Sequence, residues 1–262
     1  MSRILITNDD GVDAPGLHAL ASAAHEAGHE VVVAAPREEQ SGMSASLTAV
    51  TAQGRIVVER RPSAGFPVYA VAASPAYIVV LAGLAVFGPA PEVVLSGINR
   101  GANAGHAVLH SGTVGAALTA ANAGLRAMAV SLDVLTAGNA NSAGAAIRVP
   151  DDDVLHWQTA ADRAAALLDW LVSAPAATVL NLNVPDLPSV AGVREATLAP
   201  FGQAQMAVAE QGEGFVRMTV EQNGETLVPG TDIALLADGY ATLTALRPPA
   251  EAPSVRIPAQ RS

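Results

Sequence analysis

The stretch Arg3-Ile4-Leu5-Ile6-Thr7-Asn8-Asp9-Asp10-Gly11 joins an apolar run to an amide, two adjacent carboxylates and a glycine. The apolar run is typical of a buried parallel strand. Adjacent aspartates repel each other, and a divalent cation held by oxygen ligands, such as Mg²⁺, Mn²⁺ or Ca²⁺, would offset that repulsion. Ligands of open α/β sheets bind beyond the carboxyl ends of strands, where this pair would lie. The alternative is a plain βα turn, because Asp and Gly are common in turns and helix caps.

The residues after this stretch predict a strand–helix–strand unit with a right-handed crossover. A helix is expected from Pro15, early in the first turn, to Gly28, followed by a strand at residues 31–35. The same alternation continues along the chain, which indicates an α/β fold with a parallel sheet. Further strands are expected at residues 92–95, 126–132 and 179–185, and helices at residues 74–86, 111–123 and 156–174.

Composition excludes several classes of function. The 262 residues carry a net charge of −10, with fourteen arginines and no lysine, and half of them are hydrophobic. Broad contact with nucleic acid or an anionic membrane needs clustered cations, so neither partner is expected. The absence of cysteine excludes disulfides, thiol catalysis and cysteine-ligated zinc. No apolar run reads as a membrane span and no targeting segment is recognisable, so a cytoplasmic protein is expected.

Three later polar segments supply groups that could complete a site with Asp9 and Asp10. Ser41-Gly42 follows the second strand and offers a hydroxyl and an open backbone amide. Residues 96–105 form a glycine-rich loop containing Asn99 and Asn103, and glycines allow the backbone to approach a ligand closely. Ser111-Gly112-Thr113 opens a helix and so presents free amides to an anion, although capping alone explains Ser and Thr equally well.

Two common nucleotide-binding motifs are missing. The loops lack the Gly-Lys pair of a Walker A motif, and no G-x-G-x-x-G opens the first helix. The second absence argues against a dinucleotide-dependent oxidoreductase on the same fold.

Residues 136–153 are small, polar and acidic, which indicates a long loop or flap. Asn181 and Asn183, in the strand expected at residues 179–185, could brace a neighbouring loop or face solvent.

The pattern changes from about Val193 onward. Short alternating runs at residues 193–198 and 215–220, with Asn223-Gly224 as a hairpin signal, predict a β-rich appendage suited to dimer contacts. A short helix at residues 231–236 and a final strand at residues 239–246 complete the prediction.

These motifs occur together in the order of one known family. They are ITNDDG, APREEQSG, LSGINRGANAG, SGTVGAA, LNLNVP and the closing TD…GYATLTAL. Through them, nearly the whole chain resembles the SurE family of stationary-phase survival proteins, which are divalent-metal-dependent 5′/3′-nucleotidases. The resemblance implies a Rossmann-like three-layer α/β sandwich with a mostly parallel sheet and a C-terminal β-hairpin used for oligomerisation. It implies a catalytic domain over residues 1–190, a β-rich extension over residues 191–262 packed in part on the core, and a homodimer or homotetramer.

The resemblance also implies site residues and a reaction. One divalent ion, Mg²⁺ or Mn²⁺, would be held by Asp9, Asp10, Ser41 and Asn99, with Asp9, Asp10 and Asn99 catalytic. The reaction would be hydrolysis of nucleoside 5′- or 3′-monophosphates to nucleoside and phosphate. Substrate phosphate would be bound by Asn8, Gly42, Asn103, Ser111, Gly112 and Thr113.

The sequence departs from the family pattern at three places. His110 stands where Tyr is frequent, Ala120-Ala121-Asn122 lacks a common Glu, and Tyr77 replaces Asp in a Thr-Pro-Ala-Asp segment. These differences leave the implied metal site intact and bear on substrate preference. They are also compatible with a divergent paralogue that binds nucleotide or phosphate with little or no hydrolysis.

Overall fold

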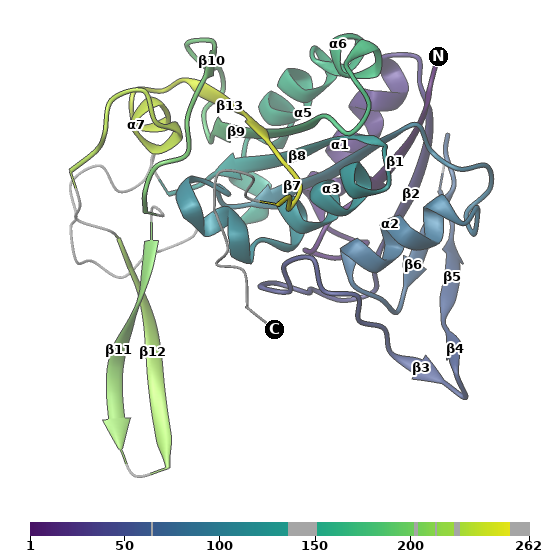
Figure 1. Cartoon of the computed structure of the whole chain (residues 1–262), viewed down its shortest axis with the longest axis horizontal. Coiled ribbons are helices and arrows are strands. Elements are labelled where there is room, and N and C mark those ends of the chain that lie inside the picture. Colours follow the sequence, from purple (N-terminus) through teal and green to yellow (C-terminus); the bar gives the residue numbers. More distant parts are fainter. Residues whose placement is uncertain (64, 136–150, 202–203, 213, 223–225, 252–262) are drawn as a thin grey trace, which may run out of the picture.

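The computed structural model describes all residues except 64, 136–150, 202–203, 213, 223–225 and 252–262 (Figure 1). Most of the predicted 136–153 flap therefore lies outside the described residues. No helix in the described part of the chain is long and apolar enough to cross a bilayer.

A nine-stranded sheet forms the centre of the molecule, in the order β10-β13-β9-β8-β7-β1-β2-β6-β5. The strands from β9 to β6 run parallel, whereas β5 and β13 are antiparallel to the strands β6 and β9 beside them. Their bounds are Arg3–Thr7 (β1), Glu30–Pro36 (β2), Val58–Arg61 (β5), Val68–Val71 (β6), Val93–Arg100 (β7), Arg126–Asp133 (β8), Val179–Pro185 (β9), Val193–Glu195 (β10) and Ala241–Leu246 (β13).

Helices cover both faces of the sheet and bury two separate apolar clusters. One cluster lies under α1 (Pro15–Glu26), α5 (Trp157–Ala165) and α6 (Leu168–Ser173). The other lies under α2 (Pro75–Gly83) and α3 (Gly112–Asn122) and is built from Val, Ile, Leu and many Ala side chains. This three-layer arrangement with a mostly parallel sheet confirms the fold class expected from the sequence.

Small elements complete the chain. They are the two-residue strands Thr51–Ala52 (β3) and Arg55–Ile56 (β4), the 3₁₀ helices Gly105–His110 (η1) and Asp152–Val154 (η2), the hairpin strands Ala204–Gly212 (β11) and Phe215–Gln222 (β12), and helix Asp232–Ala237 (α7). The hairpin projects from the body of the molecule (Figure 1). The strands β10 and β13, on either side of it in sequence, belong to the main sheet.

Three boundaries differ from the predicted ones. Leu167 donates its N–H to Ala164, three residues back, and this tightening divides the single helix predicted at residues 156–174 into α5 and α6. Strand β7 continues through Gly97 to Arg100, so the first part of the predicted glycine-rich loop is strand. The hairpin turns between Gly212 and Phe215, because β12 pairs back along β11 from that point; the Asn223-Gly224 pair expected to mark a hairpin lies outside the described residues.

Strand order determines where the polar loops meet. Strand β1 lies between β2 and β7. The chain passes from β1 to β2 on one side of β1, and after β6 it crosses back to form β7 on the other side. Such a switch point leaves a crevice at the carboxyl ends of the strands. The segments after β1, β2 and β7, singled out from the sequence, all begin at this edge.

Candidate active site

The turn after β1 is fixed by Asn8. This side chain is fully buried; its Oδ1 accepts the N–H of Gly11 at 3.2 Å and its Nδ2 donates to the Gly11 carbonyl at 3.0 Å. Gly11 itself has φ of 103°, a conformation that favours glycine. Asn8 thus fixes the turn that carries the two aspartates, and the phosphate-binding role implied for it stays a prediction.

Asp9 lies against the beginning of α3. Its side chain is 4% exposed, and the hydroxyl of Thr113 donates to its Oδ1. A methyl group at Gly112 would lie 2.7 Å from Asp9 Oδ2, so glycine permits this close approach. Burial raises the pKa of Asp9, while hydrogen bonds from Thr113 and the backbone amide of Gly112 act in the opposite direction. Gly112 and Thr113, predicted to bind phosphate, therefore face Asp9.

Asp10 is the more perturbed of the two carboxyl groups. Burial first, and then the negative charges of Asp9, Glu39 and Asp152, raise its pKa to about 7. A hydrogen bond from the backbone N–H of Arg100, 3.2 Å from Oδ2, lowers it in part. At neutral pH the ionised form of Asp10 thus lacks a positive group nearby to balance its charge, as expected of a carboxylate that binds a cation.

Asn99 completes the group of oxygens at the end of β7. Its Nδ2 donates to the carbonyl of Gly101 at 2.7 Å, which fixes the orientation of the amide. Its Oδ1 consequently lies toward the aspartates, 3.3 Å from the hydroxyl of Thr113. Three oxygen-bearing side chains from β1 and β7 therefore converge next to α3.

Ser41 and Gly42 reach the same region from the loop after β2. Both residues are exposed, and the Ser41 hydroxyl donates to Glu39 at 2.6 Å. The loop is held further along, where the Ser44 hydroxyl donates to the carbonyl of Leu109 and the backbone of Ser44 packs directly on Gly115 of α3. Ser41 thus faces the pocket at the end of a segment fixed by α3.

Asn103 is held from behind by β9. Asn183 accepts its N–H at 2.8 Å, and both Asn181 and Asn183 donate to its carbonyl, at 2.7 and 3.1 Å. The two β9 asparagines therefore brace this loop, one of the two alternatives left open by the sequence. The Asn103 side chain donates to Ser131 at 2.9 Å.

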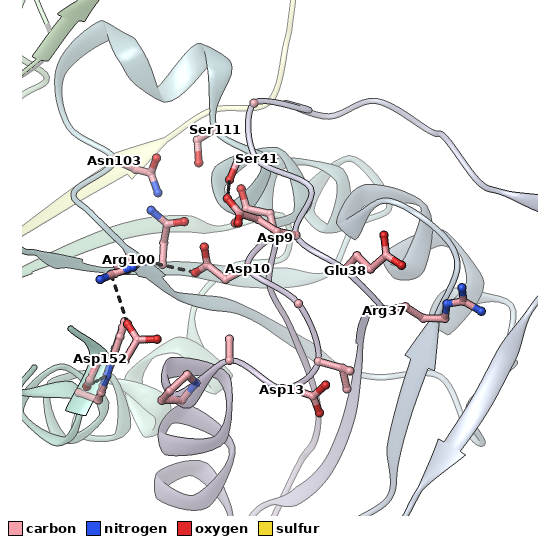
Figure 2. A pocket seen from close by; sticks show the side chains of 18 of the residues that line it. Asp9, Asp10, Asp13, Arg37, Glu38, Ser41, Arg100, Asn103, Ser111 and Asp152 are labelled. Atoms are coloured by element: carbon pink, nitrogen blue, oxygen red, sulfur yellow. Dashed lines mark hydrogen bonds and ion pairs between the residues drawn. The ribbon is translucent and has the colours of Figure 1, made fainter. Parts of the chain in front are cut away.

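Most of these groups line one pocket of about 710 Å³ (Figure 2). Among the predicted site residues, its lining includes Asp9, Asp10, Ser41, Gly42, Asn99, Asn103 and Ser111. Asn8, Gly112 and Thr113 lie behind Asp9 and are not part of the lining.

The pocket also contains residues that the sequence did not single out. Arg37 lies at one end, and at the other end Arg100 pairs with Asp152 at 3.2 Å (Figure 2). Trp157 also lines the pocket, and its Nε1 donates to the carbonyl of Asp152 at 3.1 Å. Arg100 directly follows Asn99 and could have been found from its position. Asp152 and Trp157 could not, because they come from η2 and α5, more than fifty residues later in the chain.

Of the three departures from the family pattern, only one reaches the pocket. His110 is exposed and belongs to the lining. Tyr77 packs against the apolar cluster under α2, and Ala120 and Ala121 are buried in the same cluster. The latter two departures therefore alter the core beneath the site and leave its lining unchanged.

The donor chemistry fits a hard divalent cation. A buried carboxylate (Asp9), a half-buried one (Asp10) and an oriented amide oxygen converge, with a serine hydroxyl on the same pocket, and all-oxygen sets suit Mg²⁺ or Mn²⁺. The described residues contain no cluster of three or more His, Cys, Asp or Glu side chains arranged to hold a metal, so neutral oxygens would have to complete the set.

Comparison with known proteins identifies the family. The family model described as Survival protein SurE matches residues 4–207. The chain belongs to the SurE family. The resemblance noted from the motifs is thereby confirmed, and the SurE match extends from β1 into the projecting hairpin.

Individual SurE proteins match over nearly their whole length. The 5′-nucleotidase SurE of Nitratidesulfovibrio vulgaris strain Hildenborough is 37% identical over 257 residues, covering 94% of this chain and 93% of the relative. The 5′/3′-nucleotidase SurE of Erwinia tasmaniensis is 36% identical, covering 93% and 89%. The crystal structure of the SurE protein from Aquifex aeolicus superposes with a TM-score of 0.74 at 26% identity, covering 95% of this chain and 94% of that one.

Proposed function

We propose that this SurE protein is a divalent-metal-dependent nucleotidase that hydrolyses nucleoside 5′- or 3′-monophosphates to nucleoside and phosphate. The observation that carries the proposal is the pocket's imbalance of charge. Six carboxyl side chains line it (Asp9, Asp10, Asp13, Glu38, Glu39 and Asp152) against two guanidinium groups (Arg37 and Arg100). Such a pocket repels a phosphate ester unless a cation is bound among the carboxylates.

A divalent ion held by Asp9, Asp10 and Asn99, with Ser41, would polarise a phosphoryl oxygen and lower the pKa of a bound water. The chain's own groups supply the remainder of the chemistry. Asp9, fixed by Thr113 and by the first amides of α3, is placed to orient or accept a proton from the attacking water. Because Ser111 Oγ accepts the N–H of Val114, its own hydrogen is left to donate to a phosphoryl oxygen.

The names of the relatives support the same reaction, since they are described as 5′-nucleotidase and 5′/3′-nucleotidase. The test is release of inorganic phosphate from a panel of 5′- and 3′-nucleoside monophosphates, with Mn²⁺, with Mg²⁺ and with a chelator. Phosphate release that requires the metal supports the proposal. A thermal shift caused by nucleotide without any phosphate release would instead identify a binding protein.

We also propose that the hairpin β11–β12 joins two copies of the chain into a dimer. The hairpin projects from the body and presents Val208, Phe215 and Val216, each more than half exposed. Exposed apolar side chains on a projecting element are typical of a surface covered by a partner. A second copy is the occupant expected from the hairpin's role in the family.

A further inference from the structure

The pocket loop Gly101–Gly105 is held by a carboxylate outside the pocket. Asp232 begins α7 and is fully buried. Its Oδ2 accepts the N–H of Gly105 at 2.7 Å, and its Oδ1 accepts those of Ala199 and Ile233, each at 2.9 Å. One side chain thus joins three segments that are far apart in the sequence.

The packing around this junction is tight. The N–H of His106 donates to the carbonyl of Ala199 at 3.0 Å, and a methyl group at Gly105 would overlap the carbonyl oxygen of Phe201. Ala104 is buried in a small apolar cluster with Ala199, Ile233 and Leu236. The loop therefore lies between this C-terminal segment and the asparagines of β9 that brace Asn103.

The same loop determines two groups of the pocket. Asn103 lies two residues before Gly105, and the Gly101 carbonyl receives the amide hydrogen that orients Asn99. A shift of Gly105 would therefore be transmitted to Asn103 directly and to Asn99 through Gly101. Displacements of about 1 Å at reacting groups can reduce turnover by about a hundredfold.

We propose that Asp232 is a positioning residue for the hydrolysis proposed above, on which this inference rests. It fixes Gly105, and through Gly105 the loop that places Asn103 and Asn99 in the pocket. The hairpin strand β11 begins at Ala204, three residues after Phe201, so the base of the hairpin and the pocket loop share this junction.

The direct test is Asp232→Asn. The asparagine amide keeps one accepting oxygen, which stays with the N–H groups of Ala199 and Ile233. Its NH₂ group then faces the N–H of Gly105, and because both are donors that hydrogen bond is lost. The kcat for a nucleoside monophosphate is expected to fall about tenfold to a hundredfold, with a smaller change in KM. Leu235→Ala is the matched control, because it truncates a half-buried side chain of α7 outside the cluster that packs on Ala104, and leaves Asp232 and Gly105 intact.

A double-mutant cycle separates positioning from general loss of stability. If Asp232 acts through the loop, Asp232→Asn reduces kcat much less in an Asn103→Ala background than in the wild type. Hydrogen exchange of the peptide covering residues 101–106 should rise in Asp232→Asn and not in Leu235→Ala. If Asp232→Asn does not fold, Gly105→Ala tests the same junction from the loop side, with the same expected loss of kcat.

Three results would overturn the proposal in an active wild-type protein. They are an unchanged kcat in Asp232→Asn, an equal loss of kcat in Leu235→Ala, and a double variant whose loss of kcat is the product of the losses in Asp232→Asn and Asn103→Ala. Absence of phosphate release from the wild type would overturn the proposed nucleotidase function itself. The exchange measurement then still reports whether Asp232 holds the loop.

Discussion

Asp9 and Asp10 are adjacent in sequence and lie in different environments. Asp9 receives hydrogen bonds from Thr113 and the first turn of α3, which compensate in part for its burial. Asp10 has a single backbone donor, Arg100, and three negative neighbours. In the proposed mechanism both would hold the cation, and the difference suits Asp9, the rigidly held carboxylate, to orient the attacking water as well.

Either Asp9→Asn or Asp10→Asn is expected to abolish metal-dependent phosphate release, by a factor of at least about a thousand, with the fold retained. An amide removes one negative charge from the site and leaves its volume unchanged. Steady-state phosphate release, together with circular dichroism, checks the prediction. The exposed Asp169→Asn on α6 is the control and should retain full activity. Wild-type turnover in either site variant would mean that the pair is not the metal site.

The raised pKa of Asp10 predicts how the stability of the metal-free protein depends on pH. The folded-state pKa of about 7 exceeds the ordinary value of 3.8, so the folded state binds the proton more tightly than the unfolded state. The contribution to stability is therefore fully present below about pH 4, falls from there, and is lost once the pH has risen through 7. Urea unfolding in a chelator should show Asp10→Asn matching the wild type at or below pH 4 and exceeding it by a growing margin up to pH 8. Mn²⁺ should restore the wild type at pH 8 and not the variant; parallel pH profiles for the two proteins would contradict the assignment.

At the scale of the elements, the site depends on loops fixed by glycines. Strand order brings the segments after β1, β2 and β7 to one edge, and this could be expected from the sequence because parallel strands end together. Which groups face the pocket could not be expected, because it depends on hydrogen bonds formed across the fold. Asn8 is directed at Gly11, and Thr113 is directed at Asp9. For Asn183 the sequence left two interpretations open, a brace for a neighbouring loop or a side chain facing solvent, and the structure shows the brace. The hydrogen bond between Asp232 and Gly105 could not be expected, because nothing in the sequence around Asp232 indicates it.

Gly115→Ala tests the contact between α3 and the loop after β2. Its methyl group would overlap the backbone of Ser44 and displace the segment that carries Ser41 and Gly42. We expect a higher concentration of Mn²⁺ to be needed for half-maximal phosphate release and a lower melting temperature, although alanine favours a helix by about 1 kcal/mol over glycine.

The matched control is Gly83→Ala, a helical glycine of α2 with open space around it. It should raise the melting temperature slightly and leave the metal requirement unchanged. Identical behaviour of the two alanine variants would show that the loop contact has no part in metal binding.

At the scale of the whole molecule, the sequence predicted the α/β sandwich correctly, because five strands of the parallel sheet read as short apolar runs between helical patterns. It was less informative about the last seventy residues. Strands β10 and β13 join the main sheet, and the hairpin turns ten residues before the Asn-Gly pair taken as its signal. Local turn chemistry did not identify the turn, because pairing between strands determines the register of the hairpin.

Charged residues on the hairpin should dissociate the proposed dimer. Val208→Glu combined with Phe215→Glu places carboxylates on strands β11 and β12, where a covered apolar surface is proposed. Size-exclusion chromatography with light scattering should report a dimer or tetramer for the wild type and a monomer for the variant. Leu84→Glu, at a more exposed apolar position just after α2, is the control and should leave the mass unchanged. A monomeric wild type would remove the hairpin's proposed role.

The position of β13 has a consequence for synthesis on the ribosome. This strand, the last of the sheet in sequence, is inserted between β9 and β10, and the carboxylate that holds the pocket loop comes only shortly before it. A nascent chain can form the turn bearing both aspartates early, since β1 and β2 come first. The described residues that line the pocket all precede residue 158, so a chain released before residue 232 would carry these residues without the last strand of the sheet and without the carboxylate proposed to hold the loop.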